Sequence, residues 1–529
     1  MRRFCSYGPV EERKHFTVSR KKLVDSCVDN LVGYPEEGGH YFTIWAPRQT
    51  GKTWLIHQAK KTIESRYPET FALHCFSLGD LRGMHDEPPT GVALPPAFAD
   101  VLEMALPGNP VVQTWKDFRF LFSTDRGIWK QPLILFIDEV DTAPAGLIDL
   151  IVGRFREMYL DRGNNRLHGL ALAGVRAVLG VESERGSPFN IQRSLHVPNF
   201  TSEEVAELFR QYREESGQEV EPAVVESVYE STRGQPGLVG WFGELLTETC
   251  NPGTGKPLDM DIWHDAFRSA CVKEWNNTVL NLVKKARGEY RNHVLELFTR
   301  SDIPFTIDAE WCSYLYLHGI IDYETVSDAA GGKTEICRFA NPFIQRRLYN
   351  ALTLDLIGER SPILALEPLD ALSDVFDKPE PDLAALLVRY KKYLVRLKAS
   401  GLNPWKDQPR RADMHLREAV GHFHLYFWLK QALEGLCVVS PEFPTGNGRV
   451  DLHLQCGGKS CVIEVKSYKS QSKLETAKIQ AAGYARNLKL SSIAVALFAP
   501  VEEEEVLAKL SGQTVMDGVN VVVTAIGWV

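Results

Sequence analysis

Two carboxylates and a lysine stand on two neighbouring runs of alternating residues near the end of the 529-residue sequence. Successive side chains of a strand point to opposite faces, so Asp451 lies on the polar face of RVDLHLQC (449–456), and Glu464 shares a face with Lys466 in CVIEVK (461–466). If the two runs pair as a hairpin through the Gly-Gly turn, Asp451 comes near Glu464. Two carboxylates and a backbone carbonyl form the hard oxygen site that Mg²⁺ prefers, and a lysine beside them orients water or neutralises developing charge. The pattern predicts a metal site with a catalytic lysine.

Three further polar residues flank these runs. Glu418 lies in the first turns of MHLREAVGHFHLYFWLKQALEG, which has the pattern of an amphipathic helix. Gln480 and Tyr484 are four residues apart in the predicted helix ETAKIQAAGYARNLKL, so they share one of its faces. The resulting order of Glu, Asp, Glu-x-Lys and Gln-x-x-x-Tyr is more specific than an isolated Glu-x-Lys.

This ordered series resembles the PD-(D/E)XK nuclease superfamily in its RecB-like variety, over about residues 385–529. The proline of the family name is replaced by Val450. The resemblance implies a restriction-endonuclease-like α/β domain that hydrolyses phosphodiesters with Mg²⁺ or Mn²⁺. It also implies a role for each matching residue: Asp451 and Glu464 as metal ligands, Val465 through its carbonyl, Lys466 as the catalytic lysine, Glu418 through water, and Gln480 and Tyr484 in the site wall. Some family members keep the fold without the chemistry, but every key position is filled here.

A second group of candidate residues lies near the start of the chain, in YFTIWAPRQTGKTWLIHQAKKTI (41–63). A β-rich run and a helical run flank APRQTGKT, which fits the phosphate-loop pattern G-x-x-x-x-G-K-[ST] except at its first position. Backbone N–H groups at a helix start bind phosphate, the lysine reaches the β- and γ-phosphates, and the threonine hydroxyl holds Mg²⁺. A chance Gly-Lys-Thr at a helix start is the alternative. The predicted nucleotide-binding residues are Ala46, Pro47, Arg48, Gln49, Thr50, Gly51, Lys52 and Thr53.

Acidic residues at the end of an apolar run support the phosphate loop. PLILFIDEVD (132–141) reads as a buried parallel strand, and its acids fall at the carboxyl end, where α/β sheets bind ligands. Asp138 is predicted to anchor Mg²⁺ and Glu139 to polarise the attacking water. A solvated strand end would explain one acid better than two. Residues 169–180, GLALAGVRAVLG, look like the next core strand, and Arg176 near its end is a weaker candidate for contact with the γ-phosphate.

The first half of the chain resembles AAA-type ATPases, near the AAA-like and STAND branches, over roughly residues 4–250. The resemblance rests on HFTVSR, the phosphate loop, LFIDEVD, SPFNIQRSLHVPNFTSEEV and GQPGLV. It implies a P-loop core that uses ATP and Mg²⁺, a helical lid whose Gly-Gln-Pro turn brings Pro236 near the nucleotide, and arginine fingers acting between subunits of a homo-oligomer. Arg185 and Arg193 are the candidate fingers.

The predicted organisation is a multidomain α/β protein. We expect a P-loop core (1–190), a helical lid and connector (191–285), a winged-helix-like domain (286–352), a linker (353–384) and the nuclease-like domain (385–529). The wing either contacts DNA or serves as a rigid spacer or partner surface, and the lack of a Lys/Arg cluster in this segment favours the second role. The basic segment that opens the last domain is either a contact for nucleic acid or a solvated helix face.

Composition limits the functional classes. The net charge is −8, so any nucleic-acid contact must be local. Ten scattered cysteines without a Cys-x-x-Cys pair argue against zinc and favour reduced thiols in the cytoplasm. No apolar run is long enough for a leader or a membrane span.

The predicted function is an ATP-dependent, Mg²⁺-dependent nuclease, with DNA favoured as substrate and nucleotide state or oligomerisation controlling cleavage. Such fusions resemble defence proteins against foreign DNA. The alternative is a STAND-like switch that holds ATP and whose last domain binds nucleic acid or a partner protein without cleavage. An ATP-driven helicase is weaker, because no second motor domain is evident.

Overall fold

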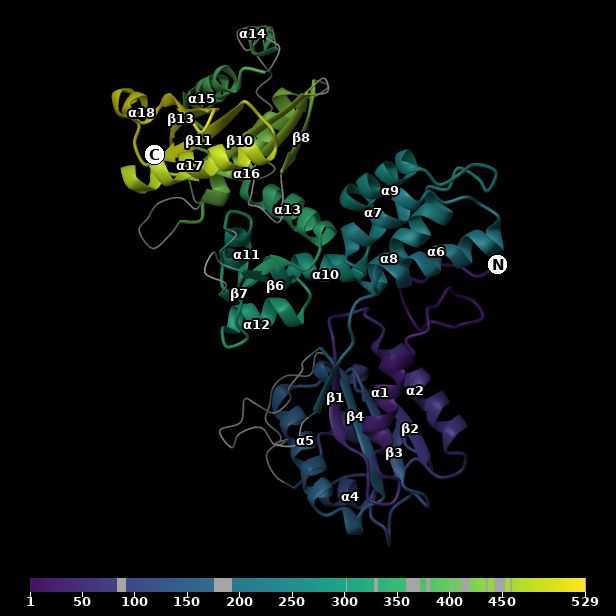
Figure 1. Ribbon diagram of the computed structural model, residues 1–529. Coiled ribbons are helices and arrows are strands. Elements are labelled where there is room, and N and C mark those ends of the chain that lie inside the picture. Colours follow the sequence, from purple (N-terminus) through teal and green to yellow (C-terminus); the bar gives the residue numbers. More distant parts are fainter. Residues whose placement is uncertain are drawn as a thin grey trace. The chain divides into compact units, whose positions relative to one another are not determined.

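The computed structural model divides into two compact units, Met1–Thr278 with Tyr314–Gly319, and Val279–Ser313 with Ile320–Val529. Figure 1 shows the ribbon of both. The residues that the structure describes are 1–82, 92–175, 193–300, 302–327, 332–357, 372–376, 381–399, 401–406, 408–410, 418–433, 436–441, 452–456 and 459–528.

The first unit is built on a five-stranded parallel sheet with the order β2-β3-β4-β1-β5. Its strands are β1 (Tyr41–Trp45), β2 (Ala72–Ser77), β3 (Leu133–Asp138), β4 (Leu167–Gly174) and β5 (Arg193–His196). Every residue of β3 and β4 is buried, as expected for central strands covered on both faces. This parallel sheet confirms the predicted α/β core. Strand β4 lies between β1 and β3, the two strands that carry the predicted nucleotide site.

Helices cover both faces of this sheet (Figure 1). One face packs against α1 (Lys21–Val32) and α2 (Lys52–Arg66). The other face packs against α3 (Pro96–Ala105), α4 (Trp115–Phe120) and α5 (Ala145–Leu160). Two continuous apolar cores therefore fix the strand ends from which the acids and the phosphate loop emerge.

Four helices follow the sheet: α6 (Ser202–Ser216), α7 (Pro222–Thr232), α8 (Pro236–Glu244) and α9 (Met260–Val272). The capping box predicted at the start of α6 is present, with Thr201 and Glu204 each bonding the other's backbone N–H. The start of the chain folds back onto these helices, where Phe4 packs against Phe209 and Tyr212. The N-terminus accordingly lies beside α6 in Figure 1.

Residues 277–357 form helices and a hairpin in the predicted order: α10 (Asn277–Ala286), α11 (Arg291–Leu297), α12 (Glu310–Leu317), β6 (Ile321–Ser327), β7 (Lys333–Phe339) and α13 (Pro342–Ile357). The turn predicted at Gly319 has a positive φ of 75°. The last five residues of helix α13, 353–357, lie within the predicted linker. The identification as a winged helix stays a prediction.

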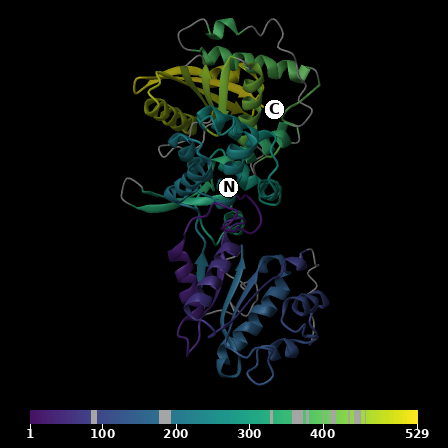
Figure 2. The ribbon, with the colours of Figure 1, turned by 90° about the vertical axis from the view of Figure 1, so that its right-hand side faces the viewer.

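The second unit contains a mixed six-stranded sheet with the order β12-β13-β11-β10-β9-β8. Its strands are β8 (Cys437–Pro441), β9 (Leu452–Cys456), β10 (Lys459–Ser467), β11 (Ser492–Ala499), β12 (Gly512–Met516) and β13 (Val519–Gly527). Helix α15 (Leu383–Ala399) lies on one face and α17 (Gln471–Asn487) on the other, as Figures 1 and 2 show. The short helices α14 (Ser373–Phe376) and α18 (Glu504–Leu510) complete this part. The predicted hairpin is present, because β9 and β10 pair antiparallel with Cys456 opposite Lys459.

Helix α16 (Glu418–Ala432) is not amphipathic, contrary to the prediction from its sequence. Most of its residues are buried, including His422 and His424. Each histidine has a tyrosine partner: the Tyr349 hydroxyl lies 3.2 Å from His422 Nδ1, and the Tyr390 hydroxyl lies 2.7 Å from His424 Nδ1. These hydrogen bonds satisfy the buried imidazole rings, which the amphipathic pattern of the sequence would place in solvent.

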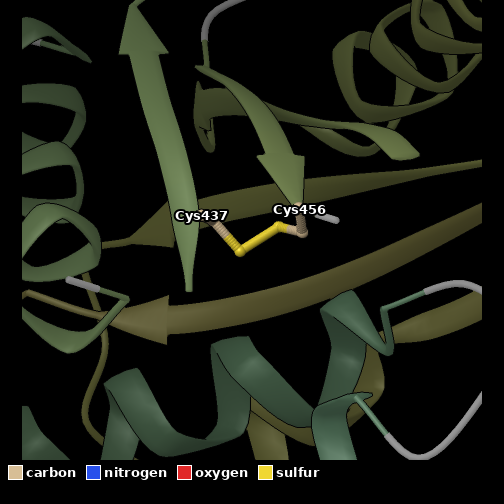
Figure 3. The surroundings of a disulfide bond; sticks show 2 residues. All are labelled: Cys437 and Cys456. Carbon is tan, nitrogen blue, oxygen red and sulfur yellow. A yellow bond between two sulfur atoms is a disulfide. The ribbon is translucent and has the colours of Figure 1, made fainter. Parts of the chain in front are cut away.

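A disulfide joins Cys437 at the start of β8 to Cys456 at the end of β9 (Figure 3). The two residues are directly opposite each other in the antiparallel ladder, with Cα atoms 4.3 Å apart. The prediction that all ten thiols are reduced is therefore wrong for this pair, because cross-strand register brings together cysteines 19 residues apart. Within the described chain, no helix is both long and apolar enough to cross a bilayer.

Candidate active sites

The phosphate loop joins β1 to α2 in the predicted way. Gly51 caps α2 with φ 93° and ψ 21°, a left-handed conformation that glycine adopts without steric cost. Ala46, in place of the first glycine of the pattern, is fully buried. The Thr50 hydroxyl donates to the Pro47 carbonyl at 2.8 Å and closes the loop.

The two reactive side chains of the loop are held by defined partners. Lys52 Nζ donates to the carbonyls of Ala46 and Pro47, both at 2.8 Å. Burial lowers its pKa to about 8, against the opposing effect of Asp141 and Asp138. A phosphate group in this loop would replace the carbonyls as the partner of the ammonium and favour its charged form.

Thr53 and Asp138 meet across 85 residues of sequence. The Thr53 hydroxyl donates to Asp138 Oδ2 at 2.7 Å, and Asp138 is largely buried at the end of β3. A hydroxyl and a carboxylate are the oxygen donors that Mg²⁺ takes in phosphoryl-transfer sites. The residues present thus fit a Mg²⁺ ion held jointly by α2 and β3.

Glu139 is fixed by a residue that the sequence analysis missed. The Ser77 hydroxyl, at the end of the neighbouring strand β2, donates to Glu139 Oε2 at 2.9 Å. Glu139 itself has a positive φ of 54°, which turns its side chain out of the β3 ladder. Only the pairing of β2 with β3 identifies Ser77, because an isolated serine at a strand end carries no signal.

The turn before α8 contacts the phosphate loop directly. The Gln235 side chain donates to the Arg48 carbonyl at 3.1 Å, and the Gly237 N–H donates to the Gln49 carbonyl at 2.9 Å. A Cβ on Gly237 would lie 2.6 Å from Gln49, so the helix can approach this closely only with glycine there. Pro236, between them, opens α8 beside the loop as predicted.

A cavity of about 600 Å³ brings most of the predicted nucleotide residues together. Residues 48–53 of the phosphate loop line it with Asp138, Glu139 and Pro236, whereas Ala46 and Pro47 do not. The segment 4–10 at the start of the chain also lines it, which the sequence analysis missed because that segment has no recognisable pattern. Arg176 and Arg185 lie outside the described residues, as does the side chain of Arg193, so none of the predicted arginine roles is tested.

The second site is centred on Lys466 in β10. Its ammonium lies 2.8 Å from Glu464 Oε1 and 3.7 Å from Glu418 Oε1. Glu418 also accepts the Ser467 N–H at 3.1 Å, which ties the start of α16 to the end of β10. Glu464 is almost fully buried, so a second cationic partner would offset the cost of its charge.

A cavity of about 310 Å³ opens beside this cluster. Glu418, Lys466, Gln480 and Tyr484 all line it, so the predicted helix face of α17 does point at the predicted lysine. Residues 299, 300 and 302, after α11, form another wall. Sequence reasoning missed this wall because it lies more than a hundred residues away in the chain.

Most of the predicted metal ligands of the second site lie among the described residues. Glu464 and Glu418 supply two carboxylates around one ammonium, a donor chemistry that fits Mg²⁺ or Mn²⁺. Val465 is buried in β10 and paired with Ala496 of β11. Asp451 lies outside the described residues. The described part of the ladder between β9 and β10 ends at Leu452, which is opposite Ile463. Among the described residues, no three His, Cys, Asp or Glu side chains form a metal cluster.

The basic segment predicted as a contact for nucleic acid is partly neutralised. On α15, Lys391 lies 2.8 Å from Glu504, and Lys398 lies 2.7 Å from Glu502. These pairs favour the solvated, structural interpretation of that helix face over a nucleic-acid contact.

No family model matches the chain, and no curated protein matches it. Among solved structures, a Walker-type ATPase of Pyrococcus abyssi is 14% identical, with a TM-score of 0.42, over 64% of this chain and 97% of that one. The Thermotoga maritima RuvB Holliday junction branch migration motor is 15% identical, with a TM-score of 0.32, over 61% and 92%. The Aeropyrum pernix Orc1 protein in complex with DNA is 16% identical, with a TM-score of 0.31, over 64% and 92%. Similarity to solved structures at TM-scores this low says nothing about the activity or the partners of this chain.

Proposed function

We propose that the first unit binds and hydrolyses ATP with Mg²⁺. The observation that carries this proposal is the bond between Thr53 and Asp138, beside the buried Lys52. Lys52 would bind the β- and γ-phosphates, Thr53 and Asp138 would hold the ion, and Glu139 would orient the attacking water. The ion supplies charge neutralisation at the phosphates when bound.

The ATPase proposal is tested with Glu139→Gln, which keeps the size of the side chain and removes the base. We expect ATP turnover to fall by about 100-fold or more while ATP affinity stays within a few fold. Glu103→Gln, an exposed residue of α3, is the matched control. Unchanged turnover in Glu139→Gln would exclude the assigned role.

We also propose that the second unit hydrolyses phosphodiesters of DNA with Mg²⁺ or Mn²⁺. The single observation that supports this best is the convergence of Glu418, Glu464 and Lys466 on a cavity that Gln480 and Tyr484 also line. Glu464 and Asp451 would hold the metal, with the Val465 carbonyl as a further ligand. The metal supplies a nucleophilic water and clamps the phosphate. Lys466 would orient that water and offset charge that develops on the phosphate.

Plasmid cleavage in Mg²⁺ or Mn²⁺ tests the nuclease proposal. We expect Lys466→Ala to reduce the rate by about 100-fold or more, the usual cost of removing a group that stabilises transition-state charge. Lys459→Ala removes an exposed lysine at the other end of the same strand and should leave the rate unchanged. If wild type and Lys466→Ala cleave equally, the nuclease proposal for this site is refuted.

The two activities together fit a nuclease controlled by nucleotide state or oligomerisation, and a role against foreign DNA is part of the same proposal. The alternative, a STAND-like switch without cleavage, is not favoured by these observations. It would bind ATP without turnover, and its second unit would be inactive in every divalent ion.

A further inference from the structure

The charges around the cavity of the second unit are unbalanced. Four cationic residues line it, Arg300, Lys466, Lys469 and Lys473, against the two carboxylates of Asp302 and Glu418. The chain as a whole carries a net charge of −8, so this concentration of positive charge is local. A local cationic cavity attracts an anion.

Two of the four cations are already engaged. Lys466 is paired with the buried Glu464. Arg300 lies 2.6 Å from Glu296 and 3.0 Å from Asp302, so its charge is balanced within its own segment. Neither group offers uncompensated charge to a ligand at the rim.

Lys469 and Lys473 differ from these two. Both are exposed, on the loop after β10 and in the first turn of α17, and neither makes an ion pair with a described residue. The nearby carboxylate of Glu475 is taken by Lys478 at 2.8 Å. Two lysines therefore flank the cavity with free charge on the approach to Lys466.

We propose that Lys469 and Lys473 bind the backbone phosphates of a DNA strand and lead it to the cavity at Lys466. The inference rests on the proposed nuclease function and names the substrate contacts of that site. Along the same face of α17 follow Gln480, an exposed amide, and Tyr484, whose ring can stack on a base. Charge at the rim and a polar, aromatic wall inside suit a polynucleotide better than a free anion.

The position of Lys473 also carries a structural cost. A cation in the first turn of a helix opposes the helix dipole. A purely structural role would favour a neutral or acidic residue there. Replacement of Lys473 should therefore leave the melting temperature unchanged or raise it, while a ligand contact would be lost.

The test compares the double variant Lys469→Ala/Lys473→Ala with Lys459→Ala/Lys509→Ala, which removes the same charge from exposed lysines outside the cavity. Binding of a labelled DNA duplex and of its single strand is measured by fluorescence anisotropy in Ca²⁺, across a salt series. All proteins carry Lys466→Ala to prevent cleavage. We expect the cavity variant to bind about tenfold more weakly, with the slope of log affinity against log salt reduced by about 2. Lys473→Glu should weaken binding further without lowering the melting temperature.

The possible outcomes separate this inference from the nuclease proposal. Equal affinity and equal salt slope in the two double variants, or no DNA binding by the parent protein, would overturn the inference. DNA cleavage that depends on Lys466 would still support the nuclease. Conversely, loss of binding in the cavity variant alone, in a protein that cleaves no DNA, would support the subsite and refute the nuclease.

Discussion

At the scale of single residues, burial of Lys52 determines the pH range in which its ammonium group is charged. With its pKa lowered to about 8, the ammonium is charged at neutral pH and loses its proton as pH rises above 8. ATP phosphates favour the charged form, so binding above pH 8 requires uptake of a proton.

The affinity for ATP should therefore fall by about tenfold between pH 7 and pH 9. At pH 9, one unit above the pKa, about one Lys52 side chain in ten carries the proton that binding requires. Isothermal titration calorimetry in buffers of different ionisation enthalpy measures both the affinity and the proton. Arginine stays charged throughout this range, so any binding by Lys52→Arg should lack the dependence. The same dependence in Lys52→Arg would assign the proton to another group.

At the scale of elements, the disulfide anchors the edge strand β8 to β9. It closes a loop that spans 19 residues of sequence, which restricts the unfolded chain. Replacement of both cysteines by serine should lower the free energy of unfolding of the second unit by about 3 kcal/mol.

Urea unfolding, followed by tryptophan fluorescence, measures this loss, since Trp405 and Trp428 are buried in the second unit. A reducing agent should shift the wild-type midpoint to that of the double serine variant and leave the variant unchanged. A reductant that shifts neither protein would show that the bond contributes nothing in solution.

Helix α16 gives the second unit a pH-dependent stability. Burial lowers the pKa of His424 to about 4, so below its ordinary value of 6.5 the unfolded chain binds a proton that the folded chain excludes. The neutral His424 side chain therefore makes its full contribution to the free energy of unfolding above pH 6.5. This contribution, about 3 kcal/mol in all, is lost as pH falls toward 4.

This dependence is measured by urea midpoints of wild type and His424→Gln across that pH range. Glutamine retains an acceptor for the Tyr390 hydroxyl and does not titrate. The wild-type midpoint should fall more steeply than that of the variant below pH 6.5. Parallel curves would place the titrating group elsewhere.

At the scale of the whole molecule, each unit carries one candidate site and the chain connects them. If nucleotide state controls cleavage, ATP should change the DNA cleavage rate of wild type several-fold and have no effect on Lys52→Ala, whose phosphate loop lacks its cation. Cleavage assays with and without ATP decide this. An equal effect of ATP on both proteins would mean that the phosphate loop does not mediate it.

The sequence by itself determined the features that lie within one short segment. The phosphate loop is contiguous, so a strand, a glycine and a helix start suffice to predict it. The alternation in β10 placed Glu464 and Lys466 on one face, and helical spacing placed Gln480 with Tyr484. These patterns depend only on backbone periodicity.

Tertiary structure alone decided which distant segments meet. The order of strands placed Ser77 beside Glu139, and cross-strand register joined two cysteines that composition had marked as reduced. Packing buried most of α16, although its sequence predicted an exposed polar face. Each of these contacts depends on long-range packing free energy, which no local pattern of residues contains.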